Sequence, residues 1–248
     1  MKRRFILPVI VSLCACALLS APPAAQRAQE LAAVGPTTFA ALEQDVAREI
    51  NLARTRPAEY AAFIEQWRPL YDGREFRRPG GPALITEEGV KALDEAVRHL
   101  RAARPAPALE ISEGMCAGAA ALVKDQSGSE RTGHRGTDGS FCEQRVERFG
   151  AWRAPIGENL SYGAETARER VISLLIDDGF ASRAHRQRLL DPAFKVAGVS
   201  CGGHQLGAVC VITLAGGFTS KPAPAFTPKP DAVKRAAPAK IPPGGRRY

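Results

Sequence analysis

The feature that most restricts the fold is a pair of apolar segments near the end of the chain. Val196 to Gly202 and Ala208 to Phe218 are rich in β-branched and aliphatic residues, and residues 203–207 separate them with glycines at both ends. Two such runs around a glycine-bounded turn predict an antiparallel hairpin. With the turn centred near Gln205, Cys201 lies opposite Cys210, where the β-carbons are close enough to support a disulfide.

Four cysteines follow the first 25 residues, and their even number suggests two disulfides if the chain is exported. Three pairings are open, and the hairpin selects Cys201–Cys210. The remaining pair is then Cys116–Cys142, which would tie a helix to the segment after His134. The alternative is that cysteines of this set are buried free thiols.

Before the hairpin, the apolar spacing is mostly helical. The run from residue 39 to 66 predicts two abutting helices, because Pro57 interrupts it. A short strand is expected at 83–86, and residues 150–155 are expected to be irregular. Helices followed by a late antiparallel pair predict an α+β domain with helices packed on a small sheet. The other expected helices are 86–103, 113–126 with Ser112 as its cap, 140–149, 166–177 and 182–190.

The two ends of the chain differ from the middle. Residues 1–25 have the pattern of a secretory signal peptide, with a basic start and an apolar run that is short for a membrane span. This predicts a secreted, periplasmic or extracellular protein without a transmembrane span in the mature chain, and a lipid anchor on Cys16 is the alternative. Residues 26–39 are expected to be a loose leader, 40–219 the domain and 220–248 a disordered Pro/Lys-rich tail.

The basic charge belongs to the ends and not to the domain. Of the formal net charge of +8, residues 220–248 supply +6 and residues 1–25 supply +3, which leaves −1 for the rest. A nucleic-acid-binding domain needs a basic face on the fold itself, so no nucleic-acid partner is expected. The tail is expected to touch anionic surfaces such as a cell wall or membrane, or else to be a solvated linker.

Titratable side chains gather in glycine-rich parts of the middle of the chain. His134 lies in the segment 133–139, Glu158 follows a glycine, and His185 follows Asp177 and Asp178 at a helix end. Carboxylates are unfavourable at a helix C-terminus unless a cation or a metal is near them. Two imidazoles and two acids can bind a divalent metal, act as general acids and bases on water, or form a structural hydrogen-bond network. Only the tertiary fold could bring these residues together.

Other catalytic patterns are missing from the sequence. Ser161 and Ser182 lack a nucleophile elbow, and no phosphate-binding glycine loop is present. His204 is expected to be a solvent-facing turn residue, and His99 is expected to lie on the polar side of its helix.

Several of these motifs, in this order, resemble the CAP superfamily of cysteine-rich secretory, antigen 5 and pathogenesis-related 1 proteins, and most of all its bacterial SCP-like extracellular branch. The resemblance covers residues 44–218. It rests on the segment Asn51 to Tyr60, on Gly133-His134 with Asp138-Gly139-Ser140 and Arg145, on Gly157-Glu158-Asn159-Leu160, on Ser182 to Arg186, and on Val196 to Val199.

The resemblance implies an α-β-α sandwich with a small antiparallel central sheet and a cleft between its elements. In the family this cleft holds two histidines and two acids, and in some members a divalent metal, often zinc. Carried over, the histidines are His134 and His185, both also metal ligands, and the acids are Glu158 and Asp178, with Asp177 as the alternate to Asp178. Residues 68–107 resemble an insertion that would form a lid or one wall of the cleft.

The function expected from this resemblance is binding of a lipid, another small amphiphile or an envelope component, together with a divalent cation for which zinc is favoured. A metal-assisted hydrolase, with Glu158 as general base on a metal-bound water, is the second hypothesis. The third is a protein-interaction module in which the four residues only stabilise the cleft.

Overall fold

The structure, a computed structural model, describes residues 36–78, 81–163 and 165–221. The expected signal peptide with Cys16, the leader up to residue 35 and the tail from residue 222 lie outside these ranges. In the part that is described, no helix has the length and apolar character needed to cross a membrane.

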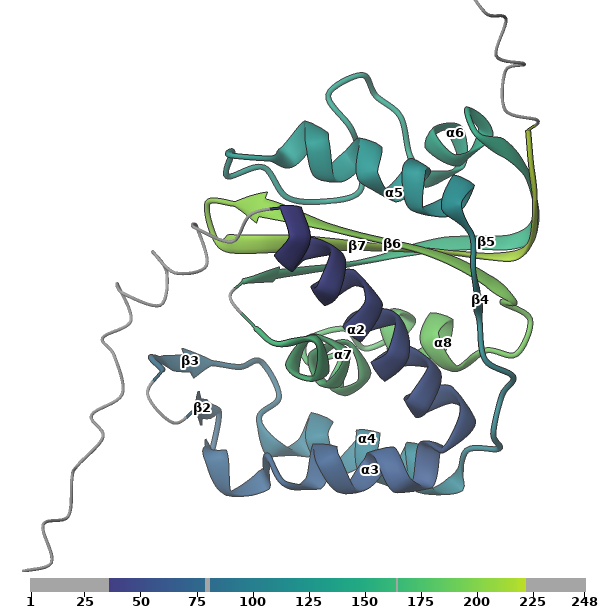
Figure 1. Cartoon of the computed structure of the whole chain (residues 1–248). Helices are drawn as coiled ribbons and strands as arrows, with labels where there is room; N and C mark the ends of the chain where they lie inside the picture. The colour runs from purple at the N-terminus through teal and green to yellow at the C-terminus, as the bar shows by residue number, and fades with distance from the viewer. Residues whose placement is uncertain (1–35, 79–80, 164, 222–248) are drawn as a thin grey trace, which may run out of the picture.

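A four-stranded sheet in the order β4-β6-β7-β5 forms the centre of the molecule (Figure 1). The predicted hairpin is confirmed as β6 (Val196–His204) and β7 (Gly207–Ser220), which pair in antiparallel register. On its other edge β7 pairs with β5 (Gly150–Gly163), while the short β4 (Glu110–Ile111) runs parallel to β6. The sheet is therefore mainly antiparallel.

The start of β5 corrects the expectation of irregular backbone at 150–155. Residues 150–153 already pair with β7, and the ladder shifts register between Arg153 and Ile156, so that only residues 154 and 155 are unpaired. Glycine and proline weigh against a strand in sequence reasoning. Here the register shift accommodates Pro155, so the strand continues on both sides of it.

Helices cover both faces of the central sheet, which confirms the α-β-α sandwich. α5 (Glu113–Gln126) and α6 (Cys142–Glu147) lie on one face. α2 (Pro36–Thr55), α7 (Ala167–Ile176) and α8 (Ala184–Leu190) lie on the other (Figure 1). The break at Pro57 is confirmed, because α3 (Pro57–Glu65) starts there as a separate helix.

A further layer lies beyond α7 and α8, made by α3 and α4 (Val90–Ala102) (Figure 1). Next to it, η1 (Arg68–Leu70) leads into a small sheet of β1 (Tyr71–Asp72), β2 (Glu75–Arg77) and β3 (Ala83–Ile85). α4 starts four residues later than the expected Thr86, and it buries Leu93, Val97 and Leu100 in the main core. Much of the stretch 68–107 is therefore integral to the domain.

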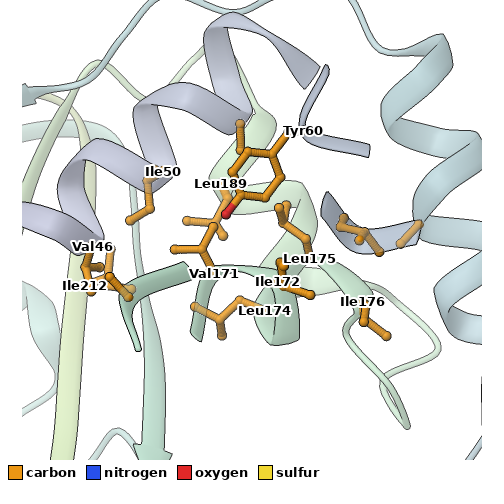
Figure 2. Packing of buried hydrophobic residues seen from close by; sticks show 14 of the residues in the cluster. Val46, Ile50, Tyr60, Val171, Ile172, Leu174, Leu175, Ile176, Leu189 and Ile212 are labelled. Atoms are coloured by element: carbon orange, nitrogen blue, oxygen red, sulfur yellow. The ribbon is translucent and has the colours of Figure 1, made fainter. Parts of the chain in front are cut away.

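The main core lies between the central sheet and the helices of the α2 side. Figure 2 shows side chains of α2, α3, α7 and α8 packed in one cluster, with Ile212 of the sheet beside Val46 of α2. β7 alternates its faces, with Ile212 in this core and Val211 in a smaller cluster under α5. A strand that is buried on both faces must be apolar at nearly every position, which explains the unbroken apolar run in the sequence.

The cysteine predictions are half right. Cys201 and Cys210 face each other across the hairpin and form a disulfide, as predicted. Cys116 and Cys142 are both free thiols, so the predicted second disulfide is wrong. The Sγ of Cys116 accepts a hydrogen bond from the Val199 amide on the β6 side of α5, whereas Gly118 of the same helix contacts α6. Positions two apart on a helix point in nearly opposite directions, so Cys116 faces away from α6.

A buried guanidinium joins the first helix to the far end of the domain. Arg54 of α2 is 1% exposed and donates hydrogen bonds to the carbonyl oxygens of Pro107, Leu189, Asp191 and Phe194 at 2.7–3.1 Å. Burying such a group is favourable only when its donors are satisfied. Arg54 lies in the segment Asn51 to Tyr60, so at least part of this motif stabilises the fold.

Replacing Arg54 by alanine should lower the free energy of unfolding by about 3–5 kcal/mol, because buried carbonyls lose their donor and a cavity remains. Urea denaturation followed by circular dichroism measures this loss. The matched control is Arg56→Ala, which removes an exposed arginine two residues away and should cost no more than about 0.5 kcal/mol. Equal losses for both variants would contradict the role given to Arg54.

Iodoacetamide labelling with peptide mapping tests the cysteine assignment. Burial raises the pKa of the Cys116 thiol, and burial with the nearby Glu158 carboxylate raises the pKa of Cys142 to about 12. Both thiols should react slowly in the native protein and fully in denaturant without reductant. Cys201 and Cys210 should require reductant. A need for reductant at Cys116 and Cys142 would restore the second disulfide.

Candidate functional site

The first half of the site is a histidine held by a buried carboxylate. Glu158, on β5, is 4% exposed, and its Oε1 lies 3.0 Å from the Nδ1 of His134. Arg145, on α6, donates to both oxygens of Glu158 at 2.9 and 2.7 Å and to the His134 carbonyl at 3.0 Å. The paired arginine makes it possible to bury this charge. His134 is thereby fixed at its backbone and at its ring.

The second half has the same arrangement, with Asp177 as the acid. The Oδ1 of Asp177 lies 2.6 Å from the Nδ1 of His185, and its Oδ2 accepts the amide N–H groups of His185 and Arg186 at 2.9 and 3.2 Å. Asp177 ends α7 in the left-handed conformation with φ of 55°. Its carboxylate therefore turns back to bind the first turn of α8, which carries His185.

Asp178, the first choice for the second acid, lies elsewhere. Its carboxylate accepts the amide N–H groups of Glu87 and Glu88 at 2.6 and 2.9 Å, just before α4. The alternate, Asp177, is the residue that pairs with His185. Counting along the helix could not separate the two, because the left-handed turn at Asp177 changes the direction of the chain between them.

The two histidines line one cleft. Its volume is about 590 Å³, and His134 and His185 are among its lining residues, together with Asp177 and Asp178. The ring of Phe180 stands edge-on to the His185 ring, with centroids 4.8 Å apart. Of residues 68–78 and 81–107, which the structure describes, none is among those lining the cleft, so the predicted lid or wall is not seen in them. The other lining residues are Thr132, Gly133, Leu160, Ser161, Tyr162, Ser173 and Leu174.

A larger groove, of about 1030 Å³, lies along α2 and includes Ile111, Cys116 and Val199 among its walls. Neither His134 nor His185 lines it. Volume alone would favour this groove, but the paired imidazoles and acids mark the smaller cleft as the chemical site.

Each histidine keeps one ring nitrogen free for a ligand. Both Nδ1 atoms are bound to carboxylates, and across the described ranges no hydrogen bond is found for either Nε2. A carboxylate on the second nitrogen is the usual support for a histidine that binds a metal. Within residues 36–78, 81–163 and 165–221, no group of three or more His, Cys, Asp or Glu side chains has the arrangement of a metal site.

Sequence reasoning missed parts of the site. Tyr162 accepts a hydrogen bond from the Gly133 amide and donates to Gln126, which holds the backbone next to His134. Its place four residues after Glu158 would have put both side chains on one face of a strand, had β5 been predicted there.

His204 is 7% exposed, and its Nε2 donates a hydrogen bond to the Arg131 carbonyl at 2.9 Å, so the prediction that His204 faces solvent is wrong. His99 is exposed, as expected.

Comparison with known proteins places this domain in a family. Residues 95–213 match CAP, the cysteine-rich secretory protein family. The match covers a little under half of the 248 residues, so it identifies this part of the chain as similar to a CAP domain. A comparison with curated proteins gave no match.

Two solved structures are similar over part of the chain. An extracellular protein containing a SCP domain from Bacillus anthracis str. Ames is 19% identical with a TM-score of 0.36, covering 44% of this chain and 34% of that one. A cysteine-rich secretory protein from Staphylococcus aureus subsp. aureus Mu50 is 14% identical with a TM-score of 0.31, covering 55% and 43%. The match thus spans less than half the length of either protein.

Replacing Asp177 and Asp178 separately by alanine should separate their roles. Asp177→Ala removes the acceptor of the His185 Nδ1–H and should change the ring nitrogen shifts of His185 in a long-range nitrogen-15 spectrum. Asp178→Ala should leave the His185 tautomer unchanged and cost about 1 kcal/mol of stability through the loss of amide acceptors before α4. A changed tautomer in Asp178→Ala alone would contradict the assignment.

Proposed function

We propose that this CAP domain binds a small amphiphile in the cleft between His134 and His185, with a divalent cation held by the two rings. The observation that carries the proposal is that both histidines line one cleft while a buried carboxylate binds the Nδ1 of each ring. Fixed rings with free nitrogens bind ligands without losing much conformational entropy.

The lining of the cleft favours an amphiphile over a purely polar ligand. Leu160, Leu174 and Phe180 supply apolar surface, and Phe180 remains 55% exposed next to His185. Small-molecule sites commonly combine apolar walls with a few placed polar groups. An apolar chain would contact these side chains, and its polar end would face the histidines.

The donor set fits a divalent cation through two imidazoles. Neutral imidazole nitrogen is a good ligand for zinc, and a carboxylate bound to the other ring nitrogen fixes the orientation of the ring. Because Glu158 and Asp177 already bind the Nδ1 atoms, the protein would supply two ligands and leave the other positions to water or to the bound molecule. Such a cation would supply a positive charge for an acidic or carbonyl group.

The geometry gives less support to hydrolysis with Glu158 as the general base. Both Glu158 oxygens receive hydrogen bonds from Arg145, and one of them also contacts His134. Glu158 is also 4% exposed and is not among the residues that line the cleft, so a water in the cleft has little access to its carboxylate. No corresponding observation favours a pure interaction module.

The location of the protein is part of the proposal. The signal-like residues 1–25 and the Cys201–Cys210 disulfide both support export, since disulfides persist in oxidising compartments. An exported amphiphile-binding protein would meet lipids and envelope components, and the basic residues of 220–248 would bring it to anionic surfaces.

Titration calorimetry with zinc chloride and with dodecylphosphocholine below its micelle concentration tests this function. The wild type should bind both, and His134→Ala or His185→Ala should weaken zinc binding at least about tenfold, since each removes one ligand. His99→Ala is the matched control, because it removes an exposed histidine outside the cleft. Absence of zinc binding by the wild type, or equal binding by all variants, would contradict the proposal.

A further inference from the structure

The loop that carries the second half of the site is held in an unusual backbone conformation. Asp177 and Arg183 have φ of 55° and 50°, and Gly179 between them has φ of 78°. Non-glycine residues in the left-handed region are disfavoured and persist only when their surroundings fix them. Contacts from outside the loop must therefore hold residues 177–183 in place.

Those contacts come from the segment around the start of α4. The Asp178 carboxylate binds the amides of Glu87 and Glu88, and the Glu88 carboxylate binds the amide of Gly179 at 3.0 Å. Tyr71 of the small sheet is also close, and burial with the charge of Asp178 raises its pKa to about 12. The loop and the segment thus exchange hydrogen bonds in both directions.

Arg183 is the centre of this connection. Its guanidinium donates to Glu88 at 2.6 Å, to Glu95 at 2.7 Å and to the carbonyl of Asp177 at 2.8 Å. The Arg183 side chain is 11% exposed, while the Glu88 and Glu95 side chains are 35% and 41% exposed, so the guanidinium is largely shielded from water and the carboxylates are partly solvated. Arg186 adds a hydrogen bond to Glu95 at 2.8 Å and others to the carbonyls of Leu175 and Ile176.

We propose that Arg183, held by Glu88 and Glu95, is a positioning residue that sets the place of the His185 ring in the cleft. It lies two residues before His185 and binds the Asp177 carbonyl, while the Asp177 carboxylate binds the His185 amide and ring. We call Arg183, Glu88 and Glu95 the clamp. The inference rests on the proposed function only where it takes His185 to bind a ligand. The claim that Arg183 positions the His185 ring does not depend on that function.

One member of the clamp, Glu88, lies outside the part of the chain that matches the family, and Glu95 lies at its edge. Glu88 precedes residue 95, where the match begins, and Glu95 is its first residue. The segment before α4 and the start of α4 would thus fix the position of His185. The position of His134 would depend on Arg145 instead. The two halves of the cleft would be held by different parts of the chain.

The test uses the full domain with Glu88→Ala and Glu95→Ala combined. At fixed pH, the carbon-bound ring protons of His185 should shift or broaden, because they lose their fixed position against Phe180. The signals of His134 and His204 should stay in place. Glu65→Ala is the matched control, because it breaks another ion pair of α4, the one between Glu65 and Arg101.

Zinc chloride titration forms the second arm, and the clamp variant should bind about tenfold more weakly than the wild type. Glu88→Gln keeps the size of the side chain, so it should fold and show a smaller His185 shift in the same direction. Unchanged His185 signals in variants that unfold cooperatively, or equal shifts at all four histidines, would overturn the inference. Absence of zinc binding by the wild type would contradict the proposed function alone, since the spectra still report the placement of His185.

Discussion

Buried arginines hold this domain together, because each joins one element of the fold to another. Arg54 ties α2 to the chain after α8, Arg145 ties α6 to β5, Arg170 ties α7 to the end of β5, and Arg186 ties α8 to the end of α7 and to α4. All four are at most 2% exposed. A buried guanidinium requires several oriented acceptors, so each of these residues restricts the arrangement of the backbone around it.

The candidate site depends on this framework. Arg145 allows Glu158 to be charged beneath His134, and Arg183 with Arg186 fixes the loop in which Asp177 turns back toward His185. The result is two histidines with the same support, one on each side of a cleft with apolar walls. Their free Nε2 atoms suit the binding of a ligand, while Glu158 is occupied by its arginine. This is why the geometry favours binding over hydrolysis.

Patterns that depend on local spacing predicted much of this correctly. The helix 113–126, the break at Pro57, the hairpin and its Cys201–Cys210 disulfide follow from periodicity and turn residues.

The predictions that were wrong concern features that tertiary contacts determine. The start of β5 is a strand because β7 pairs with it, Cys116 faces β6 because α5 packs closely there, and His204 is buried because the loop carrying Arg131 covers it. The choice between Asp177 and Asp178 turned on one left-handed residue.

A crystal structure of the protein soaked in zinc chloride, with anomalous diffraction recorded at the zinc edge, tests the central claim most directly. The account predicts one strong anomalous peak in the cleft, about 2.0–2.1 Å from the Nε2 atoms of both His134 and His185. Peaks only at exposed side chains such as His99, or a metal bound to one ring while the other lies beyond reach, would contradict it.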